Sequence, residues 1–192
     1  RRLEYYKDVD FAVYGAGAVG SMSPRTKFKK GKKKVKEISE GLYQIISDNF
    51  RSIGVKYLFK LRSDRYEIEM REQSFKISSN LIIRPWIFNY LVGDSPKFIS
   101  SLRIGDILIF GTPCDFSGEL VSPIEKSITN KKLNLMINSF NGGYVGYITD
   151  DKWYDSEEIN TYETYTMNWY GPYNGEYFSK LMKKIIRNHE DN

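Results

Sequence analysis

The chain has 192 residues, of which 41% are hydrophobic and 15% aromatic, which is enough to build the core of one ordinary domain. Its most apolar stretch, residues 81–92, is interrupted by polar residues and a proline and is shorter than the roughly 18 apolar residues of a membrane span. One cysteine, Cys114, excludes an internal disulfide, and together with one histidine, His189, it excludes a self-contained Cys/His metal cluster. Only three residues follow His189, so we expect it at a frayed terminus.

The net charge of +5 comes from one short run. Eight of the twelve residues from Arg25 to Lys36 are Lys or Arg, and the other 21 basic residues face 24 acidic ones, a net charge of −3. A body of that charge lacks the basic surface that follows a phosphate backbone, so we do not expect nucleic-acid binding. The run is typical of a solvated loop that leads into a helix. Contact with anionic lipid headgroups at a membrane surface, or with nucleic acid through this run alone, is the alternative.

Hydrophobic patterning predicts the elements of the first half. Residues 8–14 read as a buried strand, followed by a loop of small residues at 15–24. Apolar residues at three- and four-residue intervals predict an amphipathic helix over 33–53. The chain begins with Arg1-Arg2 and shows no signal-peptide pattern, so we expect it to be a portion of a longer protein.

The rest of the chain reads as alternating strands and helices. Strands are predicted over residues 55–61, 66–70, 97–104, 106–111 and 133–139. Residues 81–92 fit a short buried helix or a strand, and periodicity does not decide between them. Helices are predicted over 117–132 and 173–188. The strand–loop–helix–strand order predicts an α/β fold over residues 1–192, a mixed sheet with flanking helices in a single unit.

Three segments carry motifs in a defined order along the chain. They are GSMSP at 20–24; LRIGD at 102–106, running into GTPCDF at 111–116; and YVGYIT at 144–149, followed by Tyr162-Glu163 and Tyr170-Gly171-Pro172. Together they resemble the neutral/alkaline, non-lysosomal ceramidase family over most of the chain. The resemblance implies that the chain is the C-terminal portion of a larger ceramidase-like catalytic domain.

That resemblance also implies an activity, a cofactor and a set of site residues. The family hydrolyses the N-acyl amide bond of ceramide, a lipid-like substrate, with a zinc ion. Carried over residue by residue, the catalytic serine falls on Ser23, the carboxylate zinc ligand on Asp115, the tyrosine zinc ligand on Tyr147 and a substrate-binding tyrosine on Tyr162. The two histidine ligands of the family lie upstream of the Ser-Pro loop, so an upstream segment or chain has to supply them. Family habit further implies a secreted or extracytoplasmic protein.

Elementary chemistry agrees with this assignment in kind and leaves simpler interpretations open. A catalytic zinc needs a few protein ligands and an open position, lowers the pKa of bound water to about 7 and polarises an amide carbonyl. An Asx-turn or helix cap is the simpler interpretation of Asp115, packing that of Tyr147, and a turn before proline that of Ser23. Cys114 has no histidine partner for nucleophilic catalysis, so we expect a buried, inert thiol.

Two departures from the family pattern support a second hypothesis. Asp115 stands where the family has glutamate, and its side chain is shorter by about 1.5 Å. Ser21 and Arg25 stand where the family usually has an acidic or amide residue and an asparagine. A zinc-dependent hydrolase that is complete only with the upstream histidines is the first hypothesis. A catalytically eroded binding domain of the same family is the alternative.

Overall fold

The computed structural model describes residues 2–6, 10–28, 30–50, 52, 54, 60–78, 81–155, 164 and 166–190. The chain divides into two compact parts, residues 1–15 with 23–57 and residues 16–22 with 58–192. Among the described residues, the first part contains two helices and the second part contains every strand.

The first part holds α1 (Arg2–Tyr6) and α2 (Lys32–Phe50), and α2 confirms the amphipathic helix predicted at 33–53. The strand predicted at 8–14 is wrong for residues 10–14, its described portion, which lie outside any helix or strand. Phe11 and Val13 are 76% and 81% exposed there, because no strand lies among the described residues of this part to pair with them. None of the helices seen in the described ranges has the length and apolar character needed to cross a bilayer.

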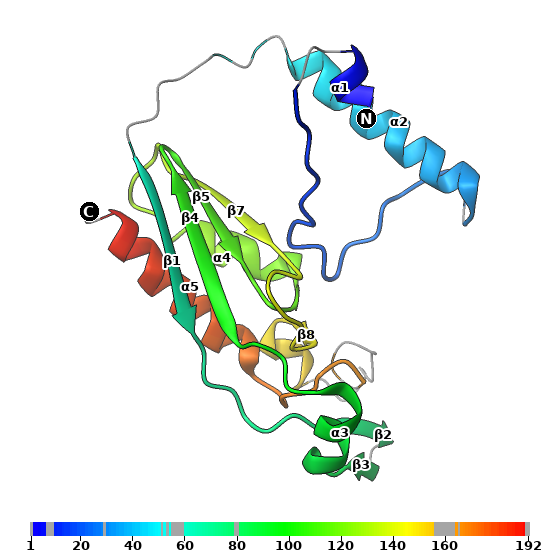
Figure 1. The fold of residues 1–192 in the computed structure, drawn as a ribbon, viewed down its shortest axis with the longest axis vertical. Helices are drawn as coiled ribbons and strands as arrows, with labels where there is room; N and C mark the ends of the chain where they lie inside the picture. The colour runs from blue at the N-terminus through cyan, green and yellow to red at the C-terminus, as the bar shows by residue number, and fades with distance from the viewer. Residues whose placement is uncertain are drawn as a thin grey trace. The chain divides into compact units, whose positions relative to one another are not determined.

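A four-stranded mixed sheet organises the second part, in the order β1-β4-β5-β7 (Figure 1). Its strands are β1 (Leu61–Glu67), β4 (Phe98–Ile104), β5 (Ile107–Gly111) and β7 (Asn134–Asn138). β4 pairs antiparallel with both β1 and β5, and β7 runs parallel to β5. The tight turn between β4 and β5 uses Gly105 at φ +56°, a left-handed conformation that glycine adopts without strain. The strands predicted at 97–104, 106–111 and 133–139 are confirmed as β4, β5 and β7.

Helices flank this sheet, as the α/β prediction requires. They are α4 (Val121–Glu125), which lies between β5 and β7 in sequence, and α5 (Asn174–Glu190), which runs alongside the sheet in Figure 1. Side chains of the sheet and of both helices share one core, in which Phe110, Ile124, Phe178 and Met182 are all 0% exposed. The fold class is therefore confirmed as a mixed sheet with flanking helices.

Two small strand pairs complete the second part. They are β2 (Phe75–Ser78) with β3 (Leu81–Ile83), antiparallel, and β6 (Asp115–Phe116) with β8 (Tyr147–Ile148), parallel. β3 leads directly into α3 (Pro85–Val92), so residues 81–92 contain both of the structures that periodicity left open. Arg84 is extended before the proline, at φ −56° and ψ 141°, and Pro85 then starts the helix, as the proline ring requires.

Two predicted elements differ from the structure in length. The helix predicted over 117–132 is only a 3-10 turn, η1 (Gly118–Leu120), followed by α4. The helix ends early because polar side chains bind the backbone groups that a longer helix would use. Ser127 Oγ donates to the carbonyl of Ile124 at 2.6 Å, and the carboxylate of Glu190 accepts the amides of Thr129 and Asn130. In place of the two strands predicted at 55–61 and 66–70 the structure has one, β1, which includes the predicted gap at 62–65 and ends before residues 68–70; residues 55–59 lie outside the described residues.

His189 is buried, which corrects the expectation of a frayed terminus. It lies in the last turn of α5, with Nε2 2.9 Å from Oγ of Ser101 on β4 and 3.6 Å from Oδ2 of Asp64 on β1. Burial lowers the pKa of the imidazole, and the charge of Arg62 lowers it further against the opposing effect of Asp64. The neutral imidazole therefore joins the last turn of α5 to β4 through its contact with Ser101.

Acidification from about pH 7 to about pH 5 is expected to lower the thermal midpoint of unfolding through this residue. Because the folded-state pKa of His189 lies below its unfolded value, the unfolded chain takes the proton first, so stability is complete above an unfolded pKa of about 6.5 and falls below it. His189→Gln should reduce that pH dependence, although it destabilises the fold at both pH values. A loss of Tm between the two pH values that is identical in both proteins would contradict the assignment.

Candidate active site

Asp115 and Tyr147, the two predicted zinc ligands of this chain, are direct neighbours. They are register partners in the parallel β6–β8 pair. Side chains of paired residues leave a sheet on the same face, and the next residue of each strand points the opposite way. That opposite face belongs to the core, where Phe116 is 0% and Ile148 1% exposed. The structure thus makes direct register partners of two residues that the sequence places 32 residues apart.

Two glycines let the backbone close around this pair. The amide of Gly20 donates to the carbonyl of Phe116 at 2.9 Å, and a Cβ at Gly20 would lie 2.8 Å from that carbonyl oxygen and 2.9 Å from the Tyr147 hydroxyl. Gly146 has φ +88°, and its carbonyl accepts the amide of Asp115 at 2.9 Å. The loop of small residues predicted at 15–24 therefore needs a glycine where it passes Tyr147, because a side chain has no room there.

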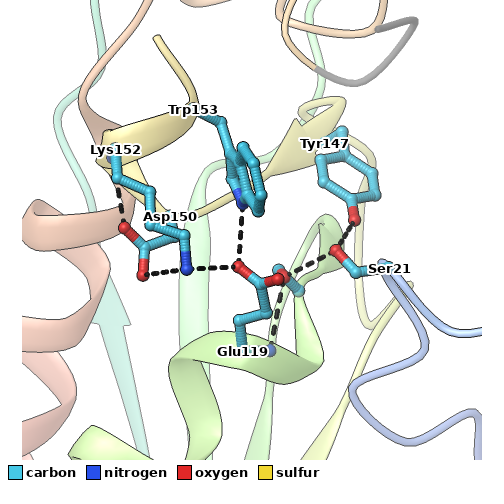
Figure 2. A network of polar contacts seen from close by, with 7 residues as sticks. Ser21, Glu119, Tyr147, Asp150, Lys152 and Trp153 are labelled. Carbon is cyan, nitrogen blue, oxygen red and sulfur yellow. Dashed lines mark hydrogen bonds and ion pairs between the residues drawn. The ribbon is translucent and has the colours of Figure 1, made fainter. Parts of the chain in front are cut away.

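A chain of hydroxyl groups ends on Tyr147 (Figure 2). Ser21 Oγ lies 2.7 Å from the hydroxyl of Tyr147 and 2.9 Å from Oγ of Ser117, and the Ser117 oxygen accepts the amide of Glu119 at 3.4 Å. Ser21 has φ +62°, a conformation that is uncommon for residues other than glycine and is often found at functional sites. Sequence reasoning noted Ser21 only as a departure from a family pattern and did not identify Ser117.

Each hydroxyl of this chain has one proton and two acceptor sites, so Ser21 can donate to the Tyr147 oxygen while it accepts from Ser117, or the two bonds can run the opposite way. Whichever oxygen donates, a phenol oxygen in such a bond is held in one orientation. Tyr147 is 2% exposed, so its ring has little freedom to leave this position.

A second polar cluster joins the segments that follow β6 and β8. Nε1 of Trp153 donates to Oε2 of Glu119 at 2.8 Å, and Nζ of Lys152 lies 3.1 Å from the same oxygen (Figure 2). Asp150 caps the 3-10 turn η2 (Asp151–Trp153) by accepting the amide of Lys152 at 3.1 Å. The bond to Glu119 raises the pKa of Lys152, so the ammonium stays charged at neutral pH. This cluster connects η2 to η1, and η1 begins directly after Ser117.

The remaining predicted residues are placed as follows. Ser23 is an exposed residue of the first part of the chain, and Tyr162 lies outside the described residues. Cys114 is 0% exposed, and burial raises its pKa to about 12, which confirms the prediction of a buried, unreactive thiol.

The donor set can be compared with what zinc requires. A carboxylate oxygen is an ordinary zinc ligand, and a phenol becomes one when a nearby cation favours its ionised form. By chemical type and by their register, Asp115 and Tyr147 therefore fit as two oxygen ligands. Across the residues that the structure describes, no three His, Cys, Asp or Glu side chains gather closely enough to hold a metal ion. Further ligands would have to come from outside these residues, as the resemblance implies.

The fold of this chain is similar to part of a solved ceramidase structure. The neutral ceramidase from Pseudomonas aeruginosa matches it with a TM-score of 0.59 and 14% sequence identity, over 87% of this chain and 34% of its own. A structure described as a ceramidase complexed with C2 matches 50% of this chain and 16% of its own, with a TM-score of 0.43 and 19% identity. The chain thus spans about a third of the Pseudomonas enzyme. No family model matches the sequence, and no curated protein matches it. The likeness confirms the predicted resemblance at the level of the fold.

Proposed function

We propose that this chain is part of a hydrolase that cleaves the N-acyl amide bond of a ceramide-like lipid. The observation that carries the proposal is the pairing of Asp115 with Tyr147 across β6 and β8. The similarity of fold supports it, since the similar Pseudomonas aeruginosa structure is that of a neutral ceramidase.

Asp115 and Tyr147 would hold a zinc ion together with two histidines from an upstream segment or chain. When bound, zinc polarises the amide carbonyl and lowers the pKa of a water molecule to about 7. Ser21 would orient the Tyr147 oxygen, and Ser117 is the second hydrogen-bond partner of Ser21. Ser23 as the catalytic hydroxyl and Tyr162 on the substrate side complete the proposal, and both roles rest on the family resemblance.

The test is hydrolysis of N-acylsphingosine by the full-length protein supplied with zinc. Asp115→Ala is expected to lower kcat/KM by about 10²-fold or more, because it removes one ligand of the charge-stabilising group. Asp115→Glu should keep most of the activity, since it preserves the carboxylate and restores the longer reach of the family residue. Asp106→Ala, in the turn between β4 and β5, is the matched control and should behave like the wild type.

Two results would count against the proposal. Turnover of Asp115→Ala at the wild-type rate would remove Asp115 from the site. A wild-type protein that holds zinc but releases no fatty acid would instead favour the catalytically eroded binding domain.

The cellular location belongs to the same proposal. A secreted or extracytoplasmic location follows from the family resemblance. Recovery of the natural protein in the culture medium or an extracytoplasmic fraction is the expected result, and its confinement to the cytosol would contradict it.

A further inference from the structure

The segment from Phe75 to Gly93 exposes an unusual amount of apolar surface. It folds as the β2–β3 hairpin and α3, which lie together in Figure 1, and Phe75 of the hairpin stacks on Phe88 of the helix with ring centroids 5.7 Å apart. Phe88 is the only residue of α3 that is buried. We define the α3 patch as the exposed apolar side chains Leu81 (53%), Ile82 (49%), Trp86 (67%), Tyr90 (88%), Leu91 (68%) and Val92 (50%).

This patch needs a covering surface. A helix without a charged residue, such as PWIFNYLV, is normally buried on all sides. An exposed apolar patch of this kind marks an interaction site. Trp86 and Tyr90 are four residues apart, so they lie on one face of the helix. Tryptophan and tyrosine are the residues enriched at the interface between water and lipid.

The charges around the patch indicate what covers it. Residues 75–93 contain two cations, Lys76 and Arg84, and no Asp or Glu. The nearest acidic residues outside this range are Glu72 and Asp94, and Asp94 forms an ion pair with Lys97. A segment whose own charges are both cationic complements anionic headgroups. The patch is also much smaller than the roughly 20 to 30 residues that each partner contributes to a standard protein interface, whereas an interfacial helix needs only its apolar face.

The β2–β3 hairpin and α3, together called the α3 module, are physically connected to the candidate active site. Phe88 meets Trp169 edge to face at 5.3 Å, and the carbonyl of Trp169 accepts the amide of Ser74 at 2.7 Å. Two residues earlier, the carbonyl of Met167 accepts the amide of Tyr147 at 2.9 Å. One short segment therefore contacts both the α3 module and the strand that carries Tyr147.

From this placement we propose that the α3 patch docks the protein on the surface of an anionic lipid bilayer, with Trp86 and Tyr90 inserted at the headgroup level. This inference concerns binding alone and is measured without turnover, so its failure and the failure of the proposed hydrolase activity are distinguishable.

Co-sedimentation of the full-length protein with vesicles of phosphatidylcholine and phosphatidylserine tests the proposal. Trp86→Ser combined with Tyr90→Ser is expected to lower the partition coefficient by at least about tenfold, since each side chain leaves the lipid. Leu61→Ser combined with Met136→Ser, which changes two exposed apolar residues of the main sheet, is the matched control and should bind like the wild type. Lys76→Glu or Arg84→Glu should weaken binding by about fivefold or more on these vesicles and leave the partition onto pure phosphatidylcholine nearly unchanged.

Tryptophan fluorescence gives an independent readout. Vesicles should shift the wild-type emission to the blue, and Trp86→Phe should remove that shift while retaining most of the binding. Wild-type binding by the Trp86/Tyr90 double variant would overturn the proposal. So would loss of binding only when the lysines of the 25–36 run are replaced, or a wild-type dimer that the double variant dissociates, which would make a second copy the occupant.

Discussion

Tyr147→Phe is expected to reduce kcat for N-acylsphingosine hydrolysis by about 10²- to 10³-fold while the protein remains folded. The substitution removes one oxygen and keeps the ring, which is 2% exposed and fills its site. That oxygen lies 2.7 Å from Ser21 Oγ at the end of the hydroxyl chain, beside the register partner Asp115. Steady-state kinetics with the full-length protein and zinc measure the effect.

Tyr170→Phe is the matched control for this experiment. Tyr170 is equally buried at 2% exposure, and its hydroxyl donates one hydrogen bond, to Oε1 of Gln73 at 2.8 Å. Its loss should cost about 1 kcal/mol of stability and leave kcat unchanged. Full activity of Tyr147→Phe, or equal inactivation by both variants, would show that the Tyr147 oxygen has no special role.

Gly146→Ala is expected to destabilise the second part of the chain by about 2 to 4 kcal/mol, judged from the cost of a left-handed residue and of disrupted hydrogen bonds. Gly146 has φ +88°, and a Cβ there would lie 2.3 Å from the backbone oxygen of Met167. The same Met167 oxygen accepts the amide of Tyr147, and the Gly146 carbonyl accepts the amide of Asp115. The substitution therefore strains both sides of the β6–β8 pair.

Urea unfolding measures this loss as a lower midpoint with an unchanged slope. Gly41→Ala is the control, because Gly41 lies on α2 and a Cβ added there would meet no described atom within 4 Å. It should be neutral or stabilise by about 0.5 to 1 kcal/mol. A Gly146→Ala protein as stable as the wild type would mean that the backbone at Met167 moves freely, contrary to the constraint described above.

The elements that could be predicted from sequence are those with a strong local pattern. The β4–β5 hairpin has a glycine at its turn, and α2 and α5 have apolar residues at helical spacing. The strand expected at 8–14 had the right composition, but a strand also needs a partner, and that information is not local. The short α4 reflects side chains that compete for the backbone, such as Ser127, which helical periodicity does not register.

The candidate site was predictable in its residues and not in its geometry. Family motifs pointed to Asp115 and Tyr147, but β6 and β8 have two residues each, too few for a periodic signal. The contact of Ser21 with Tyr147 joins residues 126 positions apart and depends on the left-handed turn at Ser21. His189 was misplaced for a similar reason, because its burial depends on Ser101 and Asp64 of distant strands.

The central claim is that Asp115 and Tyr147 hold part of a zinc site. Zinc content per chain of the purified full-length protein, measured by elemental analysis after dialysis, tests it most directly. The wild type and Asp106→Ala should retain zinc in equal stoichiometric amount, and Asp115→Ala and Tyr147→Phe should retain clearly less. Equal zinc in all four proteins, or none in the wild type, would contradict the claim.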